Sequence, residues 1–294
     1  MRFKKITIVG VGLLGGSLGL ALRDRGLAGK VTGFVRREAS VAECERCGAV
    51  DEATCDPIEA VTGADLVVFC TPLAQMRSLA EQMLSALAKG AIVTDVGSVK
   101  GSVVEDLELR VSQAGGHFVG SHPMAGAEKT GVAAARADLF AKAVCVLTPT
   151  AKTDTTAARQ VKRLWQALGA RVLEMSPEAH DALVSRSSHL PHVVAAQLVN
   201  LVLGPDQPPH QPALCANGFR DTTRIASGSP EMWRDIALAN RENLATALDG
   251  LMRGLREFQR SLKKQDLAAL AKFFEDAKVR RDQWAAKAGS ASPE

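Results

Sequence analysis

The sequence has no tyrosine, few aromatic residues and little net charge. Aromatic side chains make up 4% of its 294 residues, and 36 lysines and arginines stand against 32 aspartates and glutamates, which leaves a net charge of +4. So small an excess does not indicate nucleic acid as a partner, although it allows a local basic site for an anion. The hydrophobic fraction of 46% excludes a disordered chain and provides for a sizeable core.

Cysteine is also scarce. There are six cysteines, and most stand alone, which is typical of reduced thiols in the cytoplasm and excludes a small disulfide-stapled domain. Cys44 and Cys47 have redox or zinc spacing, but no second pair with this spacing follows. Because a structural zinc ion needs four ligands, we expect no metal.

A long uninterrupted apolar run is missing as well. Residues 6–22 follow a basic start, as in a secretory signal peptide. Five glycines interrupt this run and no A-x-A cleavage pattern follows it, while a membrane span needs about 20 apolar residues. A buried strand and helix explain the run better, so we expect a cytoplasmic protein with no membrane association.

Strand and helix patterns alternate along the first 175 residues. The expected strands lie at 4–9, 30–35, 65–70, 91–95, 117–120, 143–147 and 170–174. This alternation favours an α/β fold with a mostly parallel sheet covered on both faces. After residue 176 only helical patterns recur, so we expect an α/β domain at 1–175 and an all-α domain at 176–294.

One helical stretch is unusual in its composition. Residues 193–203 are apolar nearly all round, which is typical of a helix in a bundle core or at a subunit interface. We therefore expect the helical domain to form a homodimer.

A glycine-rich turn follows the first expected strand. Gly10, Gly12 and Gly15 form a G-x-G-x-x-G pattern that opens a helix, with Leu13 and Leu14 between them. In this context the pattern is a Rossmann fingerprint: the glycines allow a tight turn, backbone approach to a pyrophosphate and close packing of helix on strand. The free N–H groups of the helix start bind the phosphates. The first domain is therefore predicted to bind a dinucleotide.

The residues after the second strand bear on the choice of dinucleotide. An acidic residue about 20 positions beyond the motif binds the ribose of NAD, but here Val35 is followed by Arg36 and Arg37. A guanidinium pairs well with the 2′-phosphate of NADP. We therefore predict NADP in preference to NAD; in the alternative, Glu38 binds the ribose.

Polar segments end three of the expected strands. Thr71 and Pro72 follow one strand, and residues 95–100 and 120–128 follow two others. Ligands of open α/β sheets bind at the carboxyl ends of strands, so we expect Thr71 and Pro72 to border the cofactor. His122 lies in a Gly/Ser/Pro loop here and is a candidate catalytic residue, with a structural histidine as the alternative.

Four further segments follow the fingerprint in a characteristic order. They are GSVK (97–100), SHPMAGAEKTG (121–131), SHLPH (188–192) and GFRDTTRIA (218–226). In this combination the chain resembles the prephenate/arogenate dehydrogenase family of tyrosine biosynthesis over about residues 4–285. The resemblance implies oxidative decarboxylation of a cyclohexadienol, with hydride transfer to NAD(P)+, loss of CO2 and aromatisation of the ring.

The resemblance also implies roles for matching residues. His122 matches a catalytic histidine that accepts a proton from the ring hydroxyl, Ser98 a serine that orients this hydroxyl and the nicotinamide, and Arg224 an arginine that holds the side-chain carboxylate. Since the base must be neutral, activity is expected to fall near the ordinary histidine pKa of about 6.5.

Two arginines are candidates for binding the substrate, and one of them differs from the residue that is common in the family. Arg220 and Arg224 are four residues apart, which places them on one face of an expected helix, and a substrate with two carboxylates needs fixed positive charge. Asn217 and Arg220 differ from the glycine or lysine common in the family. This leaves open whether prephenate, arogenate or both are accepted.

Two histidines flank a proline within a helical stretch. Pro191 can kink the helix and so aim His189 and His192 into the cleft, and the resemblance places His192 at the substrate site. Asp221 and Trp233 resemble residues near that site.

Two other classes of protein are alternatives to a prephenate/arogenate dehydrogenase. One is a dehydrogenase of the hydroxy-acid type with a helical second domain, which uses a lysine as its acid/base group. The other is a non-enzymatic NADP-sensing protein, which does not need Ser98, His122 and Arg224 together.

Overall fold

Eight strands form one sheet in the computed structural model, which describes residues 2–126 and 129–290. The strands are β1 (Phe3–Val9), β2 (Ala28–Phe34), β3 (Glu52–Thr54), β4 (Leu66–Phe69), β5 (Ile92–Asp95), β6 (His117–Pro123), β7 (Val144–Thr148) and β8 (Arg171–Glu174). Their order is β3-β2-β1-β4-β5-β6-β7-β8. The first six strands have the order of a Rossmann fold, which confirms the predicted fold class.

The sheet is parallel except at one pair. β6 and β7 run antiparallel, with His122 opposite Val146 and Pro123 opposite Cys145. This pairing extends β6 to Pro123, so His122 lies in a strand and the prediction that it lies in a loop is wrong. Proline is tolerated there because it ends the strand.

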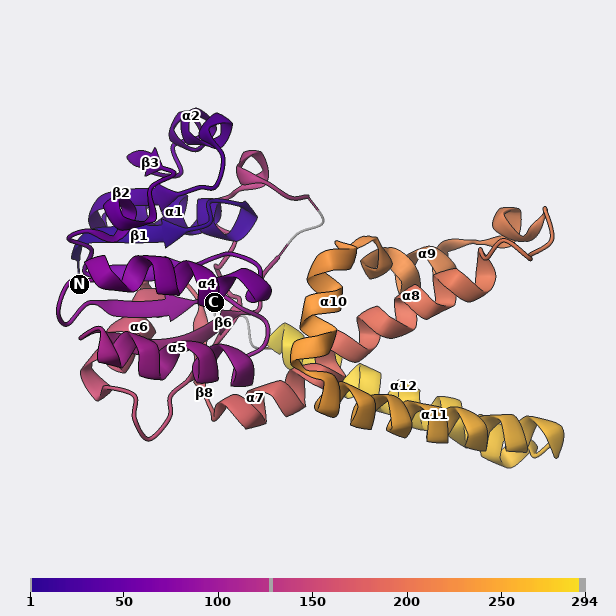
Figure 1. Cartoon of the computed structure of the whole chain (residues 1–294). Helices are drawn as coiled ribbons and strands as arrows, with labels where there is room; N and C mark the ends of the chain where they lie inside the picture. The colour runs from indigo at the N-terminus through magenta and orange to yellow at the C-terminus, as the bar shows by residue number, and fades with distance from the viewer. Residues whose placement is uncertain (1, 127–128, 291–294) are drawn as a thin grey trace. The chain divides into compact units, whose positions relative to one another are not determined.

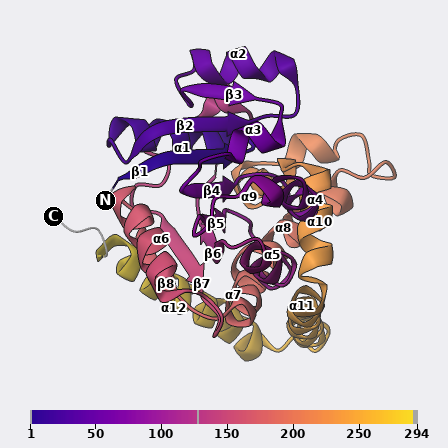
Figure 2. The same ribbon diagram turned by 60° about the vertical axis from the view of Figure 1, so that its left-hand side comes forward.

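Helices cover both faces of the sheet. α1 (Leu13–Asp24), α2 (Glu38–Arg46) and α6 (Thr155–Ala167) contribute to one buried apolar cluster, and α3 (Pro57–Val61), α4 (Leu73–Met83) and α5 (Gly101–Gln113) contribute to the other. Figure 2 shows the strands stacked from β3 to β8 with α6 on one side and α4 and α5 on the other. The buried β-branched strands therefore lie between two helical layers, as the sequence predicts.

The chain divides into two compact units, 1–241 and 242–294. The first contains the sheet and the helices α7 (Pro177–Val184), α8 (Leu190–Val202), α9 (Asn217–Thr223) and α10 (Pro230–Ala239). The second contains nearly all of α11 (Arg241–Lys263) and α12 (Leu267–Ser290) (Figure 1). The predicted boundary at 175 lies inside the first unit, between β8 and α7, and stays a prediction.

The apolar helix α8 is not buried within one chain. Ala195 is its single buried residue, and Leu201 is 61% exposed. The bundle-core interpretation of residues 193–203 is therefore wrong for the isolated chain, and the subunit-interface alternative stays a prediction. None of the helices described here combines the length and the hydropathy that a membrane span requires.

Candidate active site

The glycine-rich turn lies where the strand order reverses, between β1 and β4. Gly10 has a φ of +96°, and a Cβ atom there would lie 2.7 Å from Cγ2 of Thr71. A Cβ atom on Gly15 would lie 2.1 Å from the carbonyl oxygen of Gly10, so only glycine lets α1 approach β1 this closely. Both positions need glycine for the fold itself.

The start of α1 is open for an anion. Gly12 is its N-cap and provides no side-chain hydrogen bond, and no acidic residue lies in the first turn. A Cβ atom on Gly12 would meet nothing within 4 Å. Nearby, Oγ1 of Thr71 is buried without a partner among the described residues. Free N–H groups, an open space and an unpaired hydroxyl fit the phosphates of a dinucleotide.

Two arginines follow β2 beside this turn. The N–H of Gly10 donates to the carbonyl of Phe34 at 3.0 Å, which joins the turn to the end of β2. Arg36 and Arg37 come directly afterwards, and both are exposed. Within the described part of the chain neither forms an ion pair, so both are available to an anionic group.

A buried ion pair joins the ends of β5 and β6. The ammonium group of Lys100 donates to the carboxylate of Asp95 and, at 2.8 Å, to the carbonyl of Ser121. The other oxygen of Asp95 accepts from the N–H of Ser121 at 3.1 Å. Burial lowers the pKa of Lys100, and the charge of Asp95 opposes this. Sequence reasoning did not assign this pair a role.

His122 lies next to this pair and is 8% exposed. Its Nδ1 is 2.8 Å from Nε2 of His180, whereas no described residue hydrogen-bonds its Nε2. Burial lowers the pKa of His122 well below its ordinary value, and the neighbouring His180 and Lys100 lower it further. The expectation of a pKa near 6.5 is therefore wrong, and the imidazole is held neutral.

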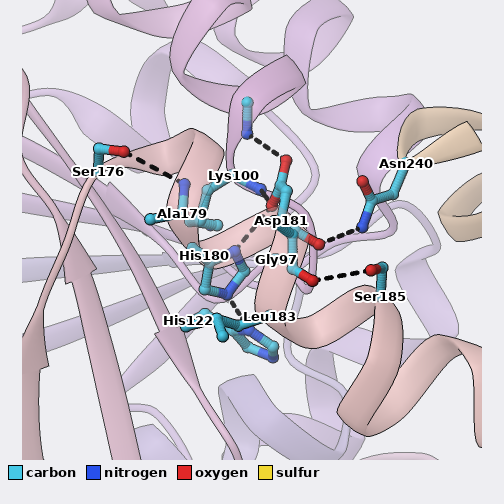
Figure 3. Close-up of polar contacts among 12 residues, drawn as sticks. Gly97, Lys100, His122, Ser176, Ala179, His180, Asp181, Leu183, Ser185 and Asn240 are labelled. Carbon is cyan, nitrogen blue, oxygen red and sulfur yellow. Dashed lines mark hydrogen bonds and ion pairs between the residues drawn. The ribbon is translucent and has the colours of Figure 1, made fainter. Parts of the chain in front are cut away.

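Sequence reasoning missed the partners of His122. His180 and Asp181 lie in the first turns of α7, which begins after the N-cap Ser176 (Figure 3). Nδ1 of His180 is 2.7 Å from Oδ1 of Asp181. The adjacent His and Asp after a Ser-Pro helix start were the available signal, but nothing in the sequence placed them beside β6.

His189 lies near His122, and the backbone of Ser98 lies near His189. Ser98 is half-buried in the link between β5 and α5. His189 is buried, with Nδ1 3.2 Å from the amide nitrogen of Asn240 and no partner for Nε2 among the described residues. Burial lowers the pKa of His189 to about 4, although Asp181 raises it.

The histidines around Pro191 both contact Trp233, His189 with its ring edge to face and His192 with its ring stacked, and otherwise have different partners. His189 contacts Asn240, whereas His192 stacks on Trp233 at 3.6 Å between ring centroids and has Nδ1 2.9 Å from the carbonyl oxygen of Ser188. A π-helical turn, Ser185–His189, precedes the proline. The helix thus accommodates Pro191 by a π turn ahead of it.

The two arginines of the fourth motif do not share one α-helix. α9 ends at Thr223, and Arg224 begins a 3₁₀ turn, Arg224–Ser227, so the predicted common face is wrong. Arg224 lines a cavity of about 990 Å³ together with Lys129 and Arg136. Arg220 is exposed and is not among the lining residues.

A series of electrostatic interactions links Arg224, which lines this cavity, with His122. The charge of Arg224 lowers the pKa of His192, after the larger effect of burial. His192 in turn lowers the pKa of His189, and His189 lowers that of His122, in both cases as smaller contributions than burial. These interactions link the candidate base with the cationic cavity through His189 and His192, although His122 itself is not among the residues that line the cavity.

The first unit has a Rossmann sheet, an uncapped helix start where the strand order reverses, and a neutral histidine on β6. This combination is typical of an NAD(P)-dependent oxidoreductase. Two family models match the chain: prephenate dehydrogenase, nucleotide-binding domain, at residues 18–174, and prephenate dehydrogenase, dimerization domain, at residues 176–276. The chain belongs to the prephenate dehydrogenase family. This excludes both alternatives, the dehydrogenase of the hydroxy-acid type and the non-enzymatic NADP-sensing protein.

Individual relatives agree with the family models. A prephenate dehydrogenase of Bacillus subtilis is 38% identical over 94% of this chain and 75% of its own length. A cyclohexadienyl dehydrogenase of Zymomonas mobilis is 35% identical over 95% of each chain. A crystal structure of the A. aeolicus prephenate dehydrogenase with hydroxyphenyl propionate and NAD+ has a TM-score of 0.90 at 36% identity, covering 96% of this chain and 99% of that one.

Proposed function

We propose that the protein oxidises prephenate with loss of CO2, and that arogenate, which carries an amino group in place of the side-chain keto group, is the alternative substrate. The observation that carries the proposal is a neutral, buried His122 whose Nε2 has no hydrogen-bond partner among the described residues, together with a cavity lined by Lys129, Arg136 and Arg224. Fixed positive charge suits a dianionic substrate, and a free imidazole nitrogen suits an alcohol that must lose its proton.

The chain's own residues supply binding and proton transfer. Nε2 of His122 accepts the proton of the ring hydroxyl while the C–H bond of the same carbon breaks. Ser98 orients this hydroxyl, Arg224 pairs with the side-chain carboxylate, and His189 and His192 line the site. A dinucleotide bound at the glycine-rich turn would supply the acceptor for the hydride. Loss of CO2 then makes the ring aromatic, and His122 returns the proton to the ring oxygen, which gives the phenol and leaves the imidazole neutral again.

The dinucleotide is expected at Gly10, Gly12 and Gly15, with Leu13, Leu14, Thr71 and Pro72 at its borders. We favour NADP over NAD because Arg36 and Arg37 are exposed beside the turn, where a guanidinium can pair with the 2′-phosphate. Arg220 is exposed and lies outside the cavity lining, so the proposal assigns the substrate carboxylate to Arg224 and not to Arg220.

Initial rates with each of the four combinations of substrate and cofactor test the proposal. We expect turnover of prephenate with NADP+ and a lower kcat/KM with NAD+. Turnover of arogenate alone would reassign the substrate, and a strong preference for NAD+ would overturn the role of Arg36 and Arg37. The double variant Arg36→Ser/Arg37→Ser provides the control: it should lose kcat/KM for NADP+ and retain it for NAD+.

A further inference from the structure

Two buried side chains lie behind the candidate base. His180 is fully buried and Asp181 is 5% exposed, and both come from α7, whereas His122 comes from β6. The rings of His122 and His180 meet edge to face, with centroids 5.1 Å apart. Buried polar groups are costly unless they are hydrogen-bonded, so the donor and the acceptor in each pair can be assigned.

Asp181 determines the first assignment. Its Oδ1 accepts from the N–H of Lys100 at 2.7 Å and its Oδ2 from the N–H of Gly101 at 2.8 Å. Oδ1 also lies 2.7 Å from Nδ1 of His180. Because a carboxylate only accepts hydrogen bonds, Nδ1 of His180 carries a proton and donates it. A neutral His180 then has its lone pair on Nε2.

The second assignment follows from the first. Nε2 of His180 lies 2.8 Å from Nδ1 of His122 (Figure 3). Since Nε2 of His180 is the acceptor, Nδ1 of His122 is the donor. The lone pair of a neutral His122 is then on Nε2, which is the nitrogen without a partner among the described residues.

We propose that His180 and Asp181 are positioning residues that hold His122 in the tautomer protonated on Nδ1 and stabilise the imidazolium formed during turnover. This inference rests on the proposed role of His122 as the base. As the substrate O–H bond breaks, an Nε2–H bond forms on His122, and its positive charge is shared with His180 through the Nδ1–H hydrogen bond. The carboxylate of Asp181 supplies the opposing charge.

Other titratable groups also face His122. They are Lys100 at the start of α5, His189 in the turn before α8 and Cys145 on β7. The charge of Lys100 is matched by Asp95, and burial raises the pKa of the Cys145 thiol, which keeps it neutral. Among the described residues, only His180 hydrogen-bonds the His122 ring.

The tautomer can be measured directly in the unmodified protein. Side-chain ¹⁵N shifts of protein labelled on its six histidines distinguish protonated from unprotonated ring nitrogens, and the signals absent from His122→Asn identify His122. At pH 7.5 we expect Nδ1 of His122 to be protonated and Nε2 to be unprotonated. A proton on Nε2 would overturn the proposal.

Two variants of His180 separate positioning from packing. His180→Leu removes the acceptor for Nδ1–H of His122, whereas His180→Gln provides a carbonyl acceptor in its place. We expect His180→Leu to lose about 10²-fold or more in kcat, with KM within about threefold, because general-base catalysis contributes on this scale. His180→Gln should restore most of that loss. His117→Gln, at the opposite end of β6, is the matched control.

The outcomes also separate this proposal from the one on which it rests. If His122→Asn is inactive while His180→Leu retains kcat, His122 remains the base and the positioning role is wrong. If His122→Asn itself retains turnover, the proposed mechanism is wrong. Equal losses in His180→Leu and His180→Gln, with cofactor affinity unchanged in both, would also contradict the positioning role.

Discussion

The two ring nitrogens of His122 have different surroundings, and these explain the tasks that we propose for them. Nδ1 is bonded to His180, 58 residues away in sequence, whereas Nε2 has no hydrogen-bond partner among the described residues. The sequence motif identified His122, Ser98 and Arg224 as candidates because each lies in a recognisable segment. It did not reveal His180, because no local pattern shows that α7 packs beside β6.

The protonation of His122 predicts a pH dependence. Burial lowers its pKa well below the ordinary value, so the neutral, proton-accepting form persists as the pH falls through about 6.5, the usual histidine value. We therefore expect kcat/KM to stay constant down to pH 6.5 and to fall only below it. A pH–rate profile with an acidic midpoint at or above 6.5 would contradict this assignment.

Arg220 and Arg224 are expected to differ in their effect on substrate binding. Arg224→Ala removes a cation that lines the cavity, so KM for the substrate should rise by about tenfold or more, as expected for loss of a charge-assisted pair, with a smaller change in kcat. Arg220→Ala should change KM little because Arg220 is not among the lining residues. Steady-state kinetics of both variants decide the matter, and equal increases in KM would restore the paired-arginine interpretation.

At the scale of elements, the longer strands and the helices that cover the sheet were predictable, because their apolar residues recur with clear periods. The three-residue β3 and the five-residue α3 were not, since so short a segment carries little periodicity. The end of α9 was also missed. There the chain changes to a 3₁₀ turn before Gly228, where a Cβ atom would lie 2.5 Å from the indole nitrogen of Trp233.

The start of α1 yields a matched pair of variants. Gly12→Ala adds a methyl group that has no atom of the described residues within 4 Å, so Tm should stay constant while dinucleotide affinity falls. Gly15→Ala places Cβ 2.1 Å from the carbonyl of Gly10, and overpacking of this kind costs about 1–3 kcal/mol or more. Tm should therefore fall by several degrees, at about 2–4 °C per kcal/mol. Thermal unfolding and cofactor titration test both, and an unchanged dinucleotide affinity in Gly12→Ala would contradict the phosphate site.

At the scale of the whole molecule, each unit exposes large apolar side chains. Leu201 on α8 is 61% exposed in the first unit. In the second unit Phe258, Phe273 and Phe274 pack on one another, yet Phe274 remains 61% exposed. Extended apolar exposure is typical of protein–protein interfaces, and the match to a dimerization-domain model at residues 176–276 points the same way.

We therefore propose a homodimer formed by the helical segments. Light scattering at micromolar concentration should give about twice the chain mass of 31.1 kDa. Leu201→Asp should shift the mass toward one chain, because a charge at an apolar interface is costly to bury. Arg159→Asp, on the exposed side of α6, is the control for the added charge. A mass of one chain for the unmodified protein would contradict the dimer.

Asp181 also has a consequence for how the enzyme matures. Its carboxylate holds the first N–H groups at the start of α5 as well as His180. A nascent chain that has reached residue 175 already contains the glycine turn and His122, yet it lacks this clamp. On the proposed roles of His122 and Asp181, we therefore expect competence for turnover only once α7 has docked, and a chain that ends at residue 175 should bind at most the dinucleotide.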